Sequence, residues 1–300
     1  EGEGGYFAGG LADDGRGPDE DDGVETWTVN SAREFINALG SNRTIILAED
    51  ANINLSDILE IEAAFKGYPN RMWCVQSSDY TGPKPLVISE SESDGQQLAL
   101  VNMENLVIKG AGNSSIEVNP RYAFCLKFVN CSHCVVENLT IGHTIGGFCS
   151  GGVIGVEQSS LTVKDCDLYG CGTYGLDLRD TYNFKLINSN IHDCTYGIIQ
   201  MRNCTMTSFE RCDFFSNREY GLIEGWANNG VKFDDCRFFA NWADSKLFYF
   251  DTPFALINCK VYHPKENLGR MVECINKGTE FFDNPLDKSI LSDNKQIYNL

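Results

Sequence analysis

The stretch Leu161-Thr-Val-Lys-Asp-Cys-Asp-Leu168 is one copy of a pattern that repeats along the chain. Apolar Leu161 and Val163 alternate with polar residues, and polar Asp165 follows them. Apolar Leu168 comes three positions after Asp165. Equivalent stretches begin at Phe184, Thr207, Val231 and Phe254, at steps of 23, 23, 24 and 23 residues. Two longer steps, of 27 and 28 residues, lead upstream to copies at Cys134 and Leu106.

Each copy contains the parts of three short strands. The alternating residues form one strand, the apolar residue after the polar turn begins a second, and a third opens with glycine at Gly175, Gly197 and Gly221. Three strands per repeat at regular spacing predict one coil of a solenoid, in which each strand pairs in parallel with its counterpart one coil away. The fixed Leu and Asn pattern of leucine-rich repeats is missing. The sequence therefore predicts an all-β fold, a single-stranded parallel β-helix.

The segment before the repeat divides into a linker and a helix. Residues 1–25 are acidic and rich in glycine, which predicts a flexible linker. Ser31-Ala-Arg-Glu34 fits a capping box, and apolar residues at positions 32, 35, 36 and 39 predict a short helix that ends at Gly40. We expect the β-helix domain to span 26–300. Residues 60–104 break the repeat and predict an irregular insertion that covers one face.

The repeat resembles the right-handed parallel β-helix proteins of the pectin-lyase-like superfamily. It is most similar to exported bacterial β-helix repeat proteins that carry Asn119-Pro-Arg-Tyr122, Gly142-His-Thr144, Cys149-Ser-Gly-Gly152 and Leu168-Tyr-Gly-Cys-Gly172. The resemblance covers residues 105–278 and implies a right-handed solenoid whose N-terminal end is capped by the short helix. Most polar turn residues match the superfamily's asparagine ladder, namely Asn138, Asp165, Asn188, Asp235 and Asn258, whereas Arg211 departs from it.

Composition limits the partners and the cellular location. The 24 Lys and Arg against 42 Asp and Glu give a net charge of −18, which argues against nucleic acid and anionic membrane surfaces. No apolar run approaches the roughly 18–20 residues of a membrane span. The acidic leader resembles the segment after the lipidated cysteine of surface lipoproteins, so we expect an exported protein, periplasmic or anchored at the outer membrane or cell surface through upstream residues. A cytoplasmic acidic tail is the alternative.

Cysteines repeat at the coil spacing. Cys166, Cys212, Cys236 and Cys259 form one column, and Cys149, Cys171 and Cys194 a second. A metal-binding thiolate stack is one interpretation, but small buried thiols that stack inside the coil explain the pattern better. We therefore predict reduced, inward-facing thiols and no metal site.

Aromatic residues suggest a sugar-binding surface. Tyr174, Tyr196 and Tyr220 each precede the glycine of a third strand, and Trp226 and Trp242 lie in neighbouring coils. Stacked rings offer apolar faces and hydroxyl groups to a sugar chain. A purely structural stack is the alternative.

The candidates for catalysis form a single polar cluster. In the superfamily, polygalacturonases use Asp residues on the outer face of the glycine-initiated strand, and pectate lyases use Asp-bound calcium with a basic residue. Here Asp177, Arg179, His192 and Asp193 are the corresponding candidates. We expect the rest of that outer row to be apolar, formed by Ile154, Ile199, Ile223 and Phe248, which argues against catalysis.

These observations favour a carbohydrate-binding β-helix protein that requires no cofactor and has a polysaccharide or glycan as its partner. A polysaccharide lyase or glycoside hydrolase is the first alternative, and calcium is expected only if the protein is a lyase. A structural or adhesion-type surface protein is the second.

Overall fold

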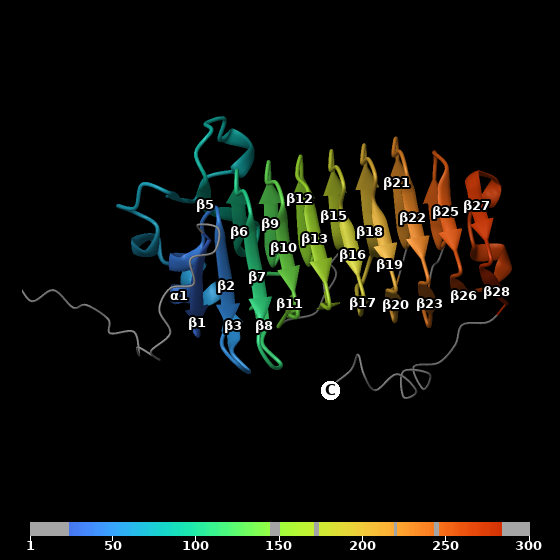
Figure 1. Cartoon of the computed structure of the whole chain (residues 1–300), viewed down its shortest axis with the longest axis horizontal. Helices are drawn as coiled ribbons and strands as arrows, with labels where there is room; N and C mark the ends of the chain where they lie inside the picture. Colours follow the sequence, from blue (N-terminus) through green and yellow to red (C-terminus); the bar gives the residue numbers. More distant parts are fainter. Residues whose placement is uncertain (1–23, 145–150, 171–173, 219–220, 243–245, 284–300) are drawn as a thin grey trace, which may run out of the picture.

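Three β-sheets, A, B and C, wind around one axis as the successive faces of a solenoid, and their strands pair in parallel except for one hairpin in sheet C (Figure 1). The computed structural model describes residues 24–144, 151–170, 174–218, 221–242 and 246–283. Each regular coil passes from sheet A to sheet B and then to sheet C before it returns to sheet A. The predicted all-β parallel solenoid is therefore confirmed.

The strands of each sheet follow one another along the axis. Over the described ranges, sheet A has ten strands in the order β1 (Glu25–Val29), β2 (Arg43–Leu47), β7 (Leu106–Gly110), β10 (Cys134–Glu137), β13 (Leu161–Lys164), β16 (Lys185–Ile187), β19 (Ser208–Glu210), β22 (Val231–Asp234), β25 (Phe254–Ile257) and β27 (Cys274–Lys277). Sheet B, counted over the same residues, has nine strands: β28 (Glu280–Phe282), β26 (Lys260–Tyr262), β23 (Arg237–Phe239), β20 (Asp213–Phe215), β17 (Asn190–His192), β14 (Asp167–Tyr169), β11 (Thr140–His143), β8 (Ser115–Val118) and β3 (Asn52–Asn54).

Sheet C contains the glycine-initiated strands. Where the chain is described, its nine strands are β24 (Phe248–Phe250), β21 (Ile223–Trp226), β18 (Gly197–Arg202), β15 (Tyr174–Arg179), β12 (Ile154–Glu157), β9 (Leu126–Val129), β6 (Gly95–Val101), β5 (Leu86–Glu92) and β4 (Arg71–Trp73). Residues 60–104, which break the repeat, supply β4, β5 and β6 at one edge. Strands β5 and β6 form an antiparallel hairpin.

The strand register reproduces the sequence repeat. Val163 pairs with Leu186, Leu186 with Phe209, Phe209 with Phe233, and Phe233 with Leu256. These side chains are 0% exposed, so similar apolar side chains stack on one another inside the coil. The aromatic rings of Phe209 and Phe233, for example, lie 4.5 Å apart and nearly parallel.

The turn between sheets A and B explains the polar residue of each repeat. Its residues have φ values between 49° and 53° at Asn138, Asp165, Asn188, Arg211, Asp235 and Asn258. This left-handed conformation costs most L-residues about 1–2 kcal/mol, and Asn and Asp adopt it most readily because their side chains bond locally. Asn138 donates to the carbonyl of Gly110 at 2.8 Å, one coil away. The expected asparagine ladder is thus present, with Arg211 in the same conformation.

The described residues also form several short helices. Helix α1 (Ala32–Ala38) begins where the capping box predicts, because the Ser31 hydroxyl accepts a hydrogen bond from the Glu34 amide at 3.3 Å. Its buried residues, among them Phe35 and Ile36, close the N-terminal end of the core. The others are α2 (Ser56–Leu59) and the 3₁₀ helices η1 (Glu62–Ala64), η2 (Ser77–Asp79), η3 (Lys265–Asn267) and η4 (Met271–Glu273). In the described ranges, no helix is both long and apolar enough to cross a membrane.

The first cysteine column lies inside the coil, as predicted. Cys166, Cys212, Cys236 and Cys259 are at most 3% exposed and are free thiols. Each thiol interacts with backbone carbonyls; Cys212, for example, donates to Leu186 at 3.4 Å. Burial raises the pKa of Cys166 to about 12. In the second column Cys194 is buried, whereas Cys149 and Cys171 lie outside the described residues.

We predict that the first column resists alkylation in the native state, because burial keeps the reagent away from these thiols and the pKa values of Cys166, Cys236 and Cys259 are raised. Iodoacetamide labelling mapped by mass spectrometry should modify Cys74, which is exposed, and leave Cys166, Cys212, Cys236 and Cys259 unmodified until the protein unfolds. Rapid native-state labelling of the column would contradict the inward orientation.

Candidate functional site

The outer face of sheet C carries two rows of side chains that follow the strand register. The first row is Lys127, Gly155, Asp177, Gln200, Glu224 and Tyr249. The second row is Val129, Glu157, Arg179, Arg202 and Trp226. Adjacent members lie about 4.8 Å apart along the axis. The face is therefore rich in charged and hydrogen-bonding groups.

The predicted apolar outer row was wrong. Ile154, Ile199, Ile223 and Phe248 are 0% exposed and belong to the core, and Asp177 pairs with Gln200 rather than with Ile199. The reason is a break in the alternation at the start of each strand. Two consecutive residues, such as Ile198 and Ile199, both point inward, so the outward positions are displaced by one residue.

Asp177 and Arg179 form an ion pair on this face. The Arg179 guanidinium donates to both Asp177 oxygens, at 3.2 Å from Nε and 2.7 Å from Nη2. This contact with Asp177 raises the pKa of Arg179. The Asp177 side chain is 10% exposed, whereas that of Arg179 is 54% exposed. The Arg179 guanidinium is therefore open to solvent, whereas the Asp177 carboxylate is largely buried against it.

Tyr174 and Glu224 connect strands two coils apart. The Tyr174 hydroxyl donates to the Glu224 carboxylate, and burial together with this bond raises the pKa of Tyr174. The Tyr174 ring crosses the intervening strand above Gly197, where a Cβ would approach a ring carbon to 2.6 Å. Glycine at position 197 therefore makes room for the ring.

Trp226 and Tyr249 form an aromatic pair beside this row. Their ring centroids lie 6.0 Å apart, and the Arg202 guanidinium lies over the Trp226 ring at 5.6 Å. Tyr249 is 50% exposed. The sequence predicted Trp226 as a sugar contact but missed Tyr249, because Phe248-Tyr-Phe250 was assigned the opposite orientation.

The insertion covers one end of the face. Met72, Val75 and Tyr80 pack against a small apolar cluster that includes Ile88 and Val129. Beside it, Lys127 pairs at 2.9 Å with Glu90, whose side chain is 1% exposed. Burial alone would raise the pKa of Glu90, but Lys127 outweighs this effect and lowers it.

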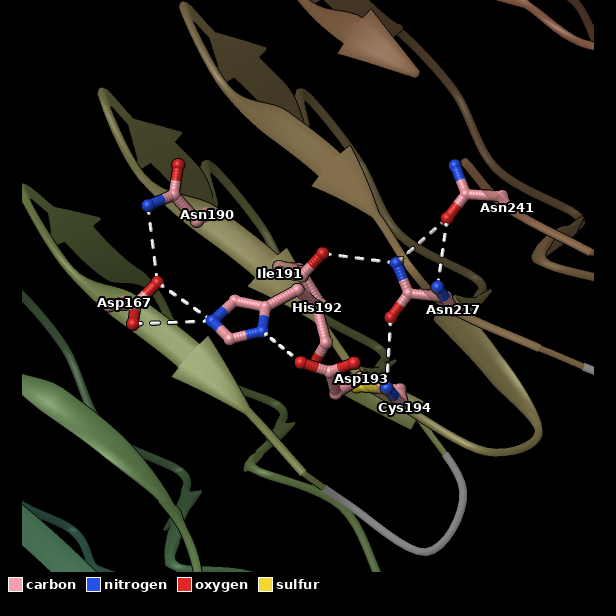
Figure 2. A network of polar contacts seen from close by, with 8 residues as sticks. All are labelled: Asp167, Asn190, Ile191, His192, Asp193, Cys194, Asn217 and Asn241. Atoms are coloured by element: carbon pink, nitrogen blue, oxygen red, sulfur yellow. Dashed lines mark hydrogen bonds and ion pairs between the residues drawn. The ribbon is translucent and has the colours of Figure 1, made fainter. Parts of the chain in front are cut away.

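The structure separates the four catalytic candidates. Asp177 and Arg179 lie on sheet C, whereas His192 ends β17 of sheet B, with Asp193 next to it. Figure 2 shows the imidazole between two carboxylates. Its Nε2 lies 3.1 Å from Asp167 and its Nδ1 lies 2.7 Å from Asp193. The predicted single cluster was therefore wrong: His192 follows Asp177 by 15 residues, less than one 23-residue coil, so the two residues occupy different sheets.

His192 is held as a cation. Burial would lower its pKa, but the hydrogen bonds to Asp167 and Asp193 outweigh burial and raise the pKa to about 9. The ring also stacks between Tyr169, at 6.0 Å, and Phe215, at 4.7 Å. A group that stays protonated at neutral pH is a poor general base there. The geometry indicates that His192 stabilises the fold.

An amide ladder fixes the backbone beyond His192. The Asn217 side chain donates to the carbonyl of Ile191 at 3.0 Å and to Asn241 at 3.1 Å (Figure 2). Its oxygen accepts from the Cys194 amide at 3.0 Å. These bonds join three successive coils at the turn that follows sheet B.

The remaining predicted aromatic residues do not form one column. The register pairs Tyr174 with Gly197, so Tyr196 lies one position earlier in its coil. Tyr220 lies outside the described residues. Trp242 is 55% exposed in the turn after β23, with the Arg218 guanidinium 5.8 Å from its ring.

The lyase alternative would need a calcium site, so we asked whether the side chains fit one. In the described ranges, no three His, Cys, Asp or Glu side chains are grouped as a metal ion requires. On the outer face of sheet C, Asp177 is bound to Arg179 and Glu224 to Tyr174. The described side chains of this face therefore do not fit a calcium site.

We predict that His192 makes stability fall with rising pH. Its pKa is about 6.5 when unfolded and about 9 when folded, so its contribution is complete below pH 6.5 and is lost as pH rises through 9. Denaturant unfolding should show a decrease on the order of 1–2 kcal/mol between pH 6.5 and pH 8.

The His192→Gln variant should be less stable at pH 6.5 and should lose most of this dependence. His133→Gln, which alters an exposed histidine, should retain it. Equal pH dependence in His192→Gln and the wild type would contradict the assignment.

Comparisons with known proteins agree with this architecture. A family model described as the right handed beta helix region matches residues 87–238 and 125–281, which together span well over half of the chain. No curated protein matches the sequence.

Two solved structures share the fold at low sequence identity. A pectate lyase from Paenibacillus sp. 0602 superposes with a TM-score of 0.55 at 10% identity, covering 89% of this chain and 80% of the lyase. A pectate lyase from Bacillus sp. N165, in complex with trigalacturonate, gives a TM-score of 0.53 at 10% identity, with 88% and 84% covered. The family match and the three parallel sheets agree, and this chain belongs to the right-handed β-helix family.

Proposed function

We propose that this protein binds a polysaccharide along the outer face of sheet C. The observation that carries the proposal is the aromatic pair of half-buried Trp226 and exposed Tyr249 beside the hydrogen-bonding residues Gln200 and Glu224. Aromatic rings offer flat apolar surfaces to sugar rings, while amide, carboxylate and guanidinium groups bond sugar hydroxyls. One exposed face thus combines both kinds of contact.

The arrangement suits an extended chain better than a small ligand. Equivalent positions repeat about every 4.8 Å along the axis, so successive coils can contact successive parts of a polymer. Arg179, Arg202 and Trp226 border the first row over three adjacent strands. The similarity to pectate lyases supports a polysaccharide partner in general terms. An exported location, with a lipid anchor on upstream residues, is part of the proposal.

We predict that Trp226→Ala and Tyr249→Ala each weaken polysaccharide binding by about tenfold or more, because each removes a ring that stacks on sugar. A glycan array would select the ligand, and calorimetry would measure the dissociation constants. Tyr182→Ala is the matched control, since Tyr182 is 45% exposed but lies outside this face. Equal affinity in all three variants would place the binding surface elsewhere. Failure to bind any glycan would favour the structural surface protein.

A hydrolase is the second candidate, and one observation favours it. Asp177 and Glu224 lie in the same outward row, two strands apart on either side of Gln200. Two strand spacings make about 9.6 Å, close to the upper limit for the carboxylates of inverting glycosidases. Both carboxylates are engaged, however, Asp177 by Arg179 and Glu224 by Tyr174.

We therefore expect binding without cleavage. Chromatography of acidic and neutral polysaccharides incubated with the protein should reveal no new products. Product release that disappears in both Asp177→Asn and Glu224→Gln, with binding and fold retained, would establish the hydrolase instead. Calcium-dependent release of unsaturated products would establish a lyase.

A further inference from the structure

A polar groove lies at the corner between sheets A and B, on the side of the coil away from sheet C. Its volume is about 320 Å³, and its lining includes Arg211, Asp213, Asp235, Arg237, Asn258 and Lys260. Those residues come from three successive coils. The space is large enough for one sugar ring or a smaller anion.

The strand register places like charges side by side in this groove. Asp213, Arg237 and Lys260 are consecutive members of one outward row, on β20, β23 and β26. Arg237 and Lys260 are therefore direct neighbours on paired strands. Such a pair is destabilising unless an anion lies nearby.

The groove lining contains three cations, Arg211, Arg237 and Lys260, against two carboxylates, Asp213 and Asp235. The Arg237 guanidinium already holds Asp213 through two hydrogen bonds, one of them 2.7 Å long from Nε. Glu280 lies beside Lys260 on the next strand. Among the described residues, neither Arg211 nor Lys260 takes part in an ion pair.

Arg211 adds a third cation at a position where the fold does not require one. The other five residues of this turn ladder are Asn or Asp, which adopt the left-handed conformation more readily. Arg211 has a φ of 53° and is exposed, so its side chain gains nothing from burial. The stability of the fold therefore does not explain why a charged residue occupies this turn.

We propose that the groove is an oxyanion-binding site, one that takes a carboxylate or phosphate group. Guanidinium groups bind these anions through paired hydrogen bonds, and the Lys260 ammonium supplies a point charge. A bound anion would also relieve the repulsion between Arg237 and Lys260. The net charge of −18 repels an anion, but salt screens this repulsion, because exposed charges more than about 10 Å apart interact weakly at 0.1 M salt. This site is independent of the polysaccharide surface on sheet C.

Thermal unfolding of the whole protein tests the site. Sodium phosphate and sodium glucuronate are compared with sodium chloride at equal ionic strength, and glucose serves as the uncharged sugar. A ligand at about ten times its Kd should raise the Tm by a few degrees. The rise should disappear in Arg211→Gln and Lys260→Gln. It should persist in Lys260→Arg and in Lys109→Gln, which alters a lysine on sheet A.

The outcomes separate the sources of the anion. A rise with both phosphate and glucuronate supports a site for the oxyanion alone, and a rise with glucuronate only supports a site for an acidic sugar. No rise with either, a rise with glucose that equals the rise with glucuronate, or an unchanged rise in both glutamine variants would overturn the proposal. Since the ligands used here are small and the substitutions lie away from sheet C, failure would leave the polysaccharide proposal untouched.

Discussion

The parallel hydrogen-bond register between coils is the constraint on which the rest of the structure depends. Each strand in a sheet is held by its counterpart one coil away, so every residue inherits the inward or outward direction of its neighbours. A side chain at a given position must therefore pack against the side chains at the same position in the coils on either side. Phenylalanines stack on phenylalanines and thiols lie above thiols for this reason.

The same constraint builds the outer surfaces. Because side chains of adjacent strands lie about 4.8 Å apart, a single row brings together groups that are 23 or 24 residues apart in sequence. Neighbouring charges in such a row have either opposite signs, as with Asp213 and Arg237, or the same sign, as with Arg237 and Lys260. His192 shows how the fold accommodates a buried cation, with a carboxylate at each ring nitrogen and an aromatic ring on each side.

Much of the fold could be predicted from the sequence because the solenoid is periodic. The alignment of Val163 with Leu186 and Phe209, the left-handed turn at Asn138 and the capping helix all follow from spacing and residue type. The candidate site was harder to predict, since two consecutive inward residues at the start of each sheet C strand break the alternation. This one-residue displacement hid Gln200, Glu224 and Tyr249. The spacing of the repeat does place His192 and Asp177 on different sheets, because the 15 residues between them are fewer than the 23 of one coil.

Site-specific thiol accessibility tests the register of sheet C most directly. Cysteine would be introduced singly at Ile199, Gln200, Ile223 and Glu224, and native-state alkylation at each position would be measured by mass spectrometry. The observed register predicts rapid labelling at 200 and 224 and protection at 199 and 223, where the native side chains are 0% exposed. Labelling at 199 and 223 with protection at 200 and 224 would contradict it and restore an apolar outer row.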